Sequence, residues 1–376
     1  MKSRLFTPGP TPVPEDVLLR LAAPLIHHRH SEFRALLARV QKNLRTVFQT
    51  REPVLTLTAS GTGAMEACVV NLLSAEDTVI AVNGGKFGKR WGEIALRYGV
   101  RVVECAVPWG EVVQPSQMQE ALRLHPGVKA VYLTQSETST GAATDILALS
   151  AVIHQHSDAL VCVDGISSVG AHELQFDAWG IDACITGSQK GLMIPPGLSF
   201  VALSAKARKA MEGATLPRFY FDLVAALAAA EKNDTPWTPA ISLVAALDAA
   251  LLHMIEEGME EIWKRHRRLA LGLRAGIKAM GLRLFSQNPS FSVTPVWVPE
   301  PVSWQSLQSA LRIENGITVA GGQGEFAGRI FRIAHLGYYD DLDIIAVVAG
   351  LERALVQCGY SLELGRGVSA AQRALA

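Results

Sequence analysis

Lys190 is the residue of this sequence whose surroundings most clearly suggest chemistry. It follows the run Ile181–Ile185 and precedes the apolar run Leu198–Leu203, and its immediate neighbours include no acid. An ammonium group is strongly hydrated and is rarely placed between buried strands without a task. Partial desolvation lowers the pKa of a lysine and increases its nucleophilic fraction near pH 7. A Schiff base with pyridoxal phosphate needs such a lysine, although a lone lysine on a strand-to-loop turn is more often a surface residue.

Two segments upstream favour the Schiff-base interpretation. Asp164 follows the strand-like run Leu160–Val163. An aspartate there could simply cap a turn, but in a pyridoxal site it keeps the ring nitrogen protonated, so that the ring can accept electrons. Ser60–Gly63 lies between a strand and a helix, where backbone N–H groups and the helix dipole attract an anion. Glu66 replaces the third glycine of a dinucleotide fingerprint and no P-loop lysine follows, so together with Lys190 the motif predicts a single phosphate group.

Two further segments could contact the ring of such a cofactor. Phe87 is flanked by glycines in Asn83–Lys89. Core packing is the alternative for this ring, but glycine neighbours would leave one face open for stacking. The polar cluster Gln135–Gly141 follows a strand and could bond a phenolic oxygen.

Alternating strands and helices must position these residues. Near-continuous apolar strands separated by helices predict a mostly parallel sheet covered on both faces. Ligands bind at the carboxyl ends of the strands in such sheets, and the candidate residues follow strand ends. The expected strands are Val54–Thr58, Thr78–Val82, Val102–Val107, Lys129–Leu133, Ala159–Val163, Ala183–Thr186 and Leu198–Leu203. The helices expected between them are Ala64–Leu73, Gly88–Tyr98, Ser116–Leu124 and Ile146–His156.

The pattern changes beyond about residue 240, which predicts a second domain. Helical periodicity from Ile241 to Met280 indicates one long linker helix, and residues 364–376 are expected to form a loose tail. We therefore divide the chain into an N-terminal arm (1–20), a large α/β domain (21–255) and a small α+β domain (256–376). The expected strands of the small domain are Leu282–Phe285, Ser292–Val298, Gly316–Val319 and Ile330–Ala334, and its helices are Trp304–Arg312 and Asp341–Cys358.

Composition narrows the possible partners. Lysine plus arginine equals aspartate plus glutamate at 35 each, so no overall charge attracts nucleic acid or an anionic membrane. The five cysteines are widely spread without a CxxC pair, which favours the cytoplasm. No apolar stretch has the length of a signal peptide or a membrane helix. His27, His28 and His30 lack an HExxH motif or acidic partners, so we predict no metal site and a polar pocket edge or plain surface there.

A series of motifs, in order over nearly the whole chain, resembles the class V aminotransferases of fold type I, specifically the alanine–glyoxylate/serine–pyruvate aminotransferase family. One motif would be weak, whereas the ordered series is highly specific. The resemblance implies a fold type I PLP-dependent transferase with a mostly parallel seven-stranded sheet, helices on both faces and a smaller C-terminal α+β domain. The matching motifs are Pro8–Pro10, Ser60–Gly63, Asn83–Trp91, Glu137–Gly141, Val163–Asp164, Gly187–Lys190, Pro195–Gly197, Thr238–Ser242 and Arg332–Ile333.

The resemblance implies a role for each matching residue. Lys190 would form the Schiff base with pyridoxal 5'-phosphate and move the substrate proton, and Asp164 would pair with the ring nitrogen. Ile166 and Phe87 would pack on the two ring faces, with Phe87 standing where better-known members carry a Trp. The remaining implied cofactor contacts are Thr138 to the hydroxyl and Ser60, Gly61, Thr62 and Gln189 to the phosphate.

Two sets of implied contacts involve a second subunit and the substrate. Thr235 or Thr238 of the second subunit of a homodimer would reach the phosphate. Because Thr235–Thr238 replaces the Tyr-His-His-Thr of some relatives, the choice between the two threonines stays open. Arg332 would bind the substrate carboxylate through a bidentate fork, with the backbone of Gly9 contributing.

The substrate prediction depends on how many cationic side chains are available to bind substrate carboxylates. Arg329 and Arg332 do not share a face of their strand, and a single guanidinium suits a monocarboxylate. We therefore expect alanine or serine as donor and glyoxylate or pyruvate as acceptor. Aspartate or 2-aminoethylphosphonate is the reserve choice, with His28, Arg29 or His30 as a second cation.

Two other functions are weighed and disfavoured. A cysteine desulfurase-like lyase needs a cysteine on a mobile loop before the carboxylate arginine, yet no cysteine lies between Cys184 and Cys358. A non-catalytic, hydrogenase-associated subunit would not need to retain Lys190, Asp164 and Arg332.

Overall fold

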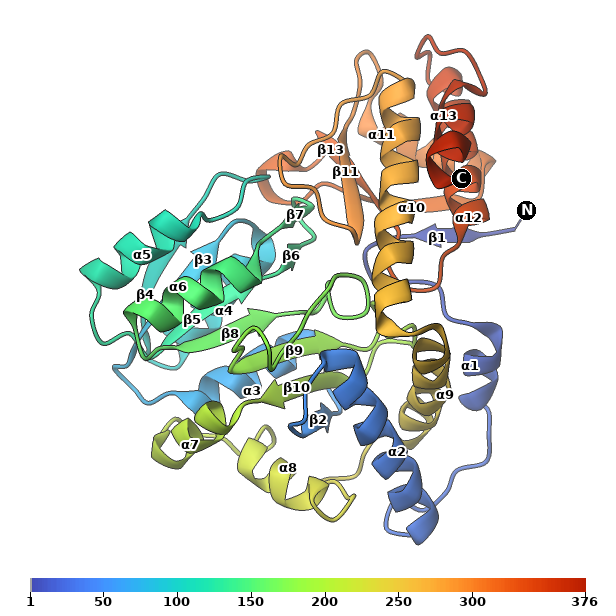
Figure 1. Ribbon diagram of the computed structural model, residues 1–376. Helices are drawn as coiled ribbons and strands as arrows, with labels where there is room; N and C mark the ends of the chain where they lie inside the picture. The colour runs from blue at the N-terminus through green and yellow to red at the C-terminus, as the bar shows by residue number, and fades with distance from the viewer. Residues whose placement is uncertain (1) are drawn as a thin grey trace.

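A seven-stranded sheet forms the centre of the larger part of the molecule (Figure 1). The computed structural model describes residues 2–376. Strand β10 runs antiparallel to both of its neighbours, and the other neighbouring pairs are parallel, which confirms the predicted mostly parallel sheet. The strand order is β2 (Val54–Leu57), β10 (Ser199–Leu203), β9 (Ala183–Gly187), β8 (Leu160–Asp164), β5 (Ala130–Thr134), β3 (Thr78–Asn83) and β4 (Arg101–Ala106).

Alternate side chains of the central strands enter two separate cores, one on each face of the sheet. Val79 and Tyr132 belong to one core, whereas Ile80 and Val131 belong to the other, as the two-residue period of a strand requires. Helices α3 (Gly61–Leu72), α4 (Lys86–Arg97), α7 (Ala205–Gly213) and α8 (Leu223–Ala230) bury their apolar faces in the first core. Helices α2 (Ser31–Phe48), α5 (Pro115–Leu124), α6 (Ile146–His156) and α9 (Ile241–Glu257) cover the second.

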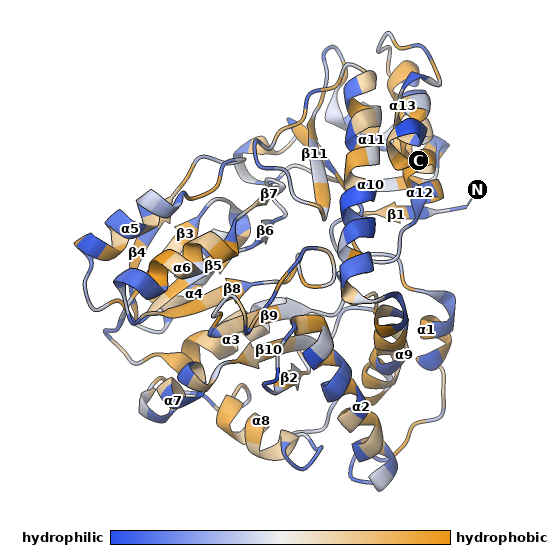
Figure 2. Ribbon diagram, viewed as in Figure 1, coloured by the Kyte–Doolittle hydropathy of each residue, from blue (hydrophilic) through white to orange (hydrophobic). Residues whose placement is uncertain are grey.

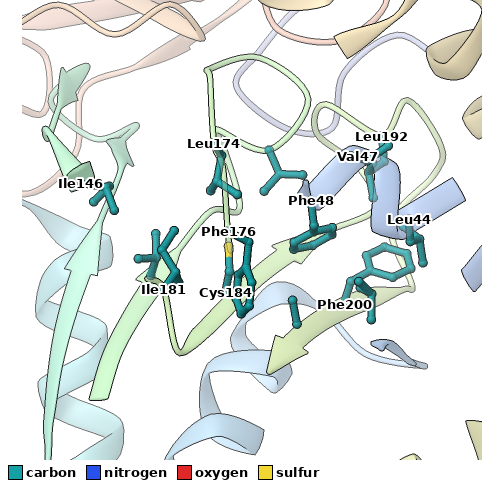
Figure 3. Close-up of a cluster of buried hydrophobic side chains, with 14 of the residues drawn as sticks. Leu44, Val47, Phe48, Ile146, Leu174, Phe176, Ile181, Cys184, Leu192 and Phe200 are labelled. Atoms are coloured by element: carbon teal, nitrogen blue, oxygen red, sulfur yellow. The ribbon is translucent and has the colours of Figure 1, made fainter. Parts of the chain in front are cut away.

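The second core reaches the segment that carries Lys190. Figure 3 shows Phe48, Phe176, Cys184 and Leu192 among its buried side chains. Leu192 stands two residues after Lys190 and is fully buried. The chain on the C-terminal side of the lysine is therefore fixed by apolar packing, which also keeps water away from its neighbourhood.

A four-stranded sheet forms the centre of the smaller part (Figure 1), in the order β1 (Arg4–Phe6), β12 (Ile317–Gly321), β13 (Ile330–Ala334) and β11 (Val293–Trp297). Strand β1 pairs parallel to β12, so the start of the chain joins the C-terminal sheet. The helices of this part are α10 (Met259–Ala279), α11 (Trp304–Ser309), α12 (Asp341–Gln357) and α13 (Arg366–Leu375). The remaining elements are α1 (Glu15–Arg20), the pair β6 (Ser136–Glu137) and β7 (Ala142–Ala143), a π-helical turn Ala310–Glu314 and a 3₁₀ turn Gly324–Phe326.

Three details of the C-terminal half correct the sequence predictions. Residues 282–285 form no strand, because only Leu284 bridges to Val296. The stretch 241–280 is two helices rather than one, broken at Gly258, whose φ of +82° lies in the left-handed region that favours glycine. The expected loose tail is instead helix α13, whose Leu375 packs against Gly272 of α10.

The distribution of hydrophobic residues agrees with this packing. Figure 2 shows them concentrated on the strands of the large sheet and on α3 and α8, whereas α10 presents both kinds of residue. Within residues 2–376, no helix combines the length and the apolar character that crossing a membrane requires.

Candidate active site

The ends of β8 and β9 and the first turns of α3 and α4 surround one cavity. Every cofactor-binding residue that the sequence predicted within one subunit lines this cavity. Its lining residues are Ser60, Gly61, Thr62, Phe87, Arg90, Ser136, Thr138, Asp164, Ile166, Ser167, Gln189 and Lys190.

Lys190 lies three residues beyond β9 and is 9% exposed. Its Nζ donates a hydrogen bond to the carbonyl of Pro8, and a Cβ on Gly9 would come within 2.4 Å of Nζ. Thr11 Oγ1 donates to the Lys190 carbonyl at 3.1 Å, so the N-terminal segment holds the lysine from both sides. Burial lowers the pKa of Lys190 to about 8, although the Asp164 carboxylate opposes this shift. A substantial part of this amine is therefore neutral near pH 8.

Asp164 is the last residue of β8 and is 3% exposed. Its Oδ1 accepts a hydrogen bond from the backbone N–H of Ile166 at 2.8 Å, which fixes the carboxylate plane. Burial raises the pKa of Asp164 to about 7, while the Ile166 N–H and the charge of Lys190 act in the opposite direction. Pairing with a positively charged ring nitrogen would offset the free-energy cost of burying this carboxylate.

Within residues 2–376, the start of α3 has backbone N–H groups without a hydrogen-bond partner in the protein. Ser60 is the N-cap of α3, yet its side chain makes no capping hydrogen bond, and the N–H groups of Gly61 and Thr62 bond no backbone carbonyl. A Cβ on Gly61 would come within 2.5 Å of Ile166, so only glycine permits this approach. Gln189 Oε1 is buried beside these groups without a hydrogen-bond partner, and the Nε2 of the same amide is the atom that could donate to an anion. Such a helix N-terminus suits a phosphate group.

Phe87 is held in place by a buried carboxylate. Glu137 Oε2 accepts hydrogen bonds from the N–H groups of Phe87 and Gly88, both at 2.9 Å, and Glu137 Oε1 accepts two from Ser139. Glu137 thus acts as the cap that the first turn of α4 otherwise lacks. Gly88 is needed at this turn, because a Cβ there would lie 2.4 Å from the Val82 carbonyl oxygen.

Arg332, on β13 of the smaller part, lies next to the cavity and contacts its lining residue Thr138. Its Nε donates to the Gly321 carbonyl at 2.8 Å and its Nη1 to the Thr138 carbonyl at 2.9 Å. These bonds fix the guanidinium plane and leave N–H groups on Nη1 and Nη2 for a carboxylate. Burial lowers the pKa of Arg332 to about 10, so the side chain stays charged at neutral pH. Arg329 lies elsewhere, stacked on Trp297 and Phe326.

Thr235 and Thr238 are the predicted site residues that the structure does not bring to Lys190. They line a different cavity, together with Tyr220 and Trp237. Thr235 Oγ1 donates to the Trp237 carbonyl. Near them, Arg29 forms an ion pair with Asp234 and donates to the Thr235 carbonyl.

The histidines that precede α2 form a small aromatic cluster. The ring of His27 lies 4.8 Å from that of His28 and 5.0 Å from that of His30. Within residues 2–376, no three His, Cys, Asp or Glu side chains are arranged to hold a metal ion.

Sequence reasoning missed Arg90, Ser136 and Ser167 as cavity residues and Glu137 as the anchor of α4. Helix α4 begins at Lys86, two residues before the predicted start, which puts Phe87 and Arg90 on one helical face. The spacing of three residues was therefore the available signal for Arg90. Ser136 and Glu137 lie in the polar cluster that the sequence did single out.

Taken together, a buried lysine with a lowered pKa, a buried aspartate and an unsatisfied helix N-terminus fit pyridoxal 5'-phosphate. The class of protein that this fold and cavity define is the fold type I PLP-dependent enzymes, as predicted. The chain belongs to the aminotransferase class-V family, whose model matches residues 5–328. It is an aminotransferase that uses pyridoxal 5'-phosphate.

Relatives with different names cover nearly the whole chain. A "Soluble hydrogenase, small subunit" of Synechococcus sp. is 44% identical over 100% of this chain and 98% of its own. An "L-aspartate--glyoxylate aminotransferase" of Paracoccus denitrificans is 36% identical over 98% and 95%. A "Serine--glyoxylate aminotransferase" of Methylorubrum extorquens is 34% identical over 98% and 95%.

Solved structures agree with this assignment. Ureidoglycine-glyoxylate aminotransferase from Bacillus subtilis superimposes with a TM-score of 0.94 at 30% identity, over 100% of this chain and 98% of its own. An alanine–glyoxylate aminotransferase from Nostoc sp. gives a TM-score of 0.89 at 30% identity, over 94% and 96%.

Proposed function

We propose that the enzyme transfers an amino group from alanine or serine to glyoxylate or pyruvate. The observation that carries this proposal is Arg332, a buried guanidinium that two carbonyls hold beside the cavity-lining residue Thr138, with N–H groups left free. One such fork binds one carboxylate, which both the amino acid and the oxo acid possess. Glyoxylate as acceptor is also supported by the names of the aspartate-, serine-, ureidoglycine- and alanine-specific proteins described above.

The other cavity residues divide the remaining tasks. Pyridoxal 5'-phosphate, when bound, supplies an electron sink for the bond that breaks at the substrate Cα. Asp164 would hold a negative charge against the ring nitrogen, and Phe87 and Ile166 would confine the ring between them. Thr138 would bond the ring hydroxyl, and Ser60, Gly61, Thr62 and Gln189 would bind the phosphate. Lys190 Nζ would hold the cofactor covalently at rest and would move the proton at the substrate Cα.

A dicarboxylate donor would need a second cation, and one of the three predicted sources, Arg29, is paired with another group. Arg29 donates to Asp234 Oδ1 at 2.5 Å and to the Thr235 carbonyl at 2.8 Å. This pairing argues against Arg29 as the second cation, whereas Arg90 lines the cavity and is assigned to the cofactor phosphate below. Aspartate remains the second candidate because the Paracoccus relative is named for it.

A panel of donors and acceptors with purified enzyme tests the proposal. Alanine or serine with glyoxylate or pyruvate should exceed aspartate in kcat/KM by at least tenfold, which corresponds to about 1.4 kcal/mol. A tenfold preference for aspartate or 2-aminoethylphosphonate would overturn the small-substrate proposal and leave the aminotransferase class intact.

Arg332→Lys should raise KM for both the amino acid and the oxo acid, because lysine keeps the charge but loses the planar fork. Arg329→Lys is the matched control, since its guanidinium stacks on Trp297 and Phe326 instead. We expect a rise of about tenfold for each substrate. If KM changed for only one of the two, Arg332 would not be the shared carboxylate clamp.

The rate of cofactor attachment to the apoprotein should follow the titration of Lys190. Because burial lowers this pKa to about 8, the neutral amine increases about tenfold per pH unit below pH 8 and levels off above it. Stopped-flow absorbance between pH 6 and pH 10 measures this profile. An ordinary lysine would give a rate that continues to rise up to about pH 10.5.

We propose that the enzyme is a homodimer in which Thr235 or Thr238 of one copy completes the phosphate site of the other. Within one chain both threonines line a cavity other than that of Lys190, together with Tyr220 and Trp237, and the exposed ring of Phe219 stacks on Trp237. Exposed aromatic groups of this kind favour an interface. Sedimentation of the active holoenzyme should give a dimer, and an active, cofactor-loaded monomer would disprove this arrangement.

We place the enzyme in the cytoplasm, a proposal supported by its five free cysteines. Burial raises the pKa of Cys68 to about 12, so that thiol is inert. The soluble-hydrogenase name of the Synechococcus relative does not favour a non-catalytic role for this chain, because Lys190, Asp164 and Arg332 are all retained and assembled.

A further inference from the structure

Arg90 is a positively charged residue that lines the cavity, and the proposed function assigns it no role. It lies on α4 one turn after Phe87, and its guanidinium carbon is 5.0 Å from the centroid of the Phe87 ring. Its Nη1 donates to Thr62 Oγ1 at 3.1 Å. Within residues 2–376 this is its one hydrogen bond, and it forms no ion pair. Most of its N–H groups therefore remain available to another acceptor.

The phosphate site otherwise lacks a full positive charge. Ser60, Gly61, Thr62 and Gln189 are neutral, and a helix N-terminus supplies only about half an elementary charge. A phosphate monoester carries about 1.5 to 2 negative charges at pH 7. The other cations at or beside the cavity, Lys190 and Arg332, serve the covalent bond and the substrate carboxylate in the proposed function.

We propose that Arg90 is a phosphate ligand of the cofactor, placed beside Thr62 by the anchored first turn of α4. The inference rests on the proposed cofactor site and deepens it. Because Glu137 binds the N–H groups of Phe87 and Gly88, the helix is rigid at this end and Arg90 is preorganised. A planar guanidinium beside a hydroxyl donor matches the geometry of a phosphate oxygen pair.

The test compares two forms of the cofactor that differ only in the phosphate. Apoprotein is titrated with pyridoxal 5'-phosphate and with pyridoxal, and both dissociation constants are measured by absorbance. Arg90→Gln should weaken binding of pyridoxal 5'-phosphate by at least about tenfold and leave pyridoxal within about twofold. Inorganic phosphate should also compete less well against pyridoxal 5'-phosphate in this variant than in the wild type.

Lys89→Gln provides the matched control. Lys89 precedes Arg90 on the same helix, is 63% exposed at its side chain and pairs with Glu93. Removing its charge should change neither dissociation constant by more than about twofold, because exposed charges are screened by solvent. An equal loss in Lys89→Gln would mean that the general field of the helix, rather than Arg90, attracts the phosphate.

Other outcomes also overturn the proposal. An equal loss for pyridoxal and its phosphate would show that Arg90 only supports the Phe87 ring. An unchanged cofactor affinity, with a raised KM for aspartate alone, would make Arg90 a reader of a second substrate carboxylate. If Arg90→Gln does not fold, Arg90→Lys replaces it, and an unchanged ratio of the two affinities would reject the proposal. Labelling of Lys190 by reduction is independent of these outcomes, so failure of the cofactor site itself would be seen separately.

Discussion

Lys190→Ala is expected to abolish turnover while the protein still binds pyridoxal 5'-phosphate non-covalently. The variant would lose the amine that is proposed to hold the cofactor and to move the substrate proton, but the proposed contacts to phosphate and ring would remain. General acid–base catalysis alone contributes roughly 10²- to 10⁴-fold, so the loss of kcat should reach at least that range. Single-turnover and steady-state assays measure it.

Lys206→Ala is the control for this variant. Lys206 is partly buried, donates to the Ala159 carbonyl at 2.9 Å and pairs with Asp182, away from the cavity. Its replacement removes a lysine of the same domain and should leave kcat unchanged. Near-wild-type multiple turnover by Lys190→Ala would mean that the Schiff-base lysine has been wrongly assigned.

Asp164→Asn should have the second largest effect, because it removes the negative charge that we propose to lie opposite the ring nitrogen. The asparagine oxygen can still accept the hydrogen bond from the Ile166 N–H, so the local backbone should be preserved. We expect kcat/KM to fall roughly a thousandfold, or about 4 kcal/mol of transition-state stabilisation. An unchanged rate would show that another group keeps the ring protonated.

The same substitution that lowers activity should not destabilise the apoprotein. Burial raises the pKa of Asp164 from 3.8 to about 7. The free energy of unfolding that this group contributes therefore decreases as the pH rises from about 4 to 7, and the cost of the buried charge is complete above pH 7. At pH 8 the Asp164→Asn apoprotein should be at least as stable as the wild type, which denaturant unfolding would measure.

Asp182→Asn is the control that shows how the loss of a buried aspartate outside the cavity affects stability and activity. Asp182 precedes β9 at the end of the strand away from Lys190, and it accepts hydrogen bonds from Val161 N–H and Ser204 Oγ. We expect this variant to lose stability without a specific loss in kcat. The contrast between the two aspartates tests whether Asp164 is retained for function.

The central part of the fold could be predicted from sequence because its signals are local. Strands such as Leu160–Asp164 are apolar throughout, as parallel strands buried on both faces must be. Polar residues at their carboxyl ends then had to meet at one edge of the sheet. This argument places Asp164 and Lys190 in the same cavity without knowledge of any contact.

The features that could not be predicted from sequence depend on contacts between segments that are distant in the chain. Helix α13 is stable because Leu375 packs on Gly272, about a hundred residues away, and a short terminal pattern does not reveal that partner. Glu137 becomes a helix cap only when β6 lies against the start of α4. Thr235 and Thr238 line a different cavity from Lys190, and the role proposed for them requires a second copy of the chain, which no local pattern describes.

Reduction of the purified holoenzyme with borohydride, followed by peptide mass spectrometry, tests the central claim most directly. Reduction converts the bond between cofactor and lysine into a stable amine that survives proteolysis. We predict a pyridoxyl phosphate group on Lys190, and its release when an amino donor is added before reduction. A label on another lysine, or a fully active enzyme with no labelled peptide, would contradict the assignment.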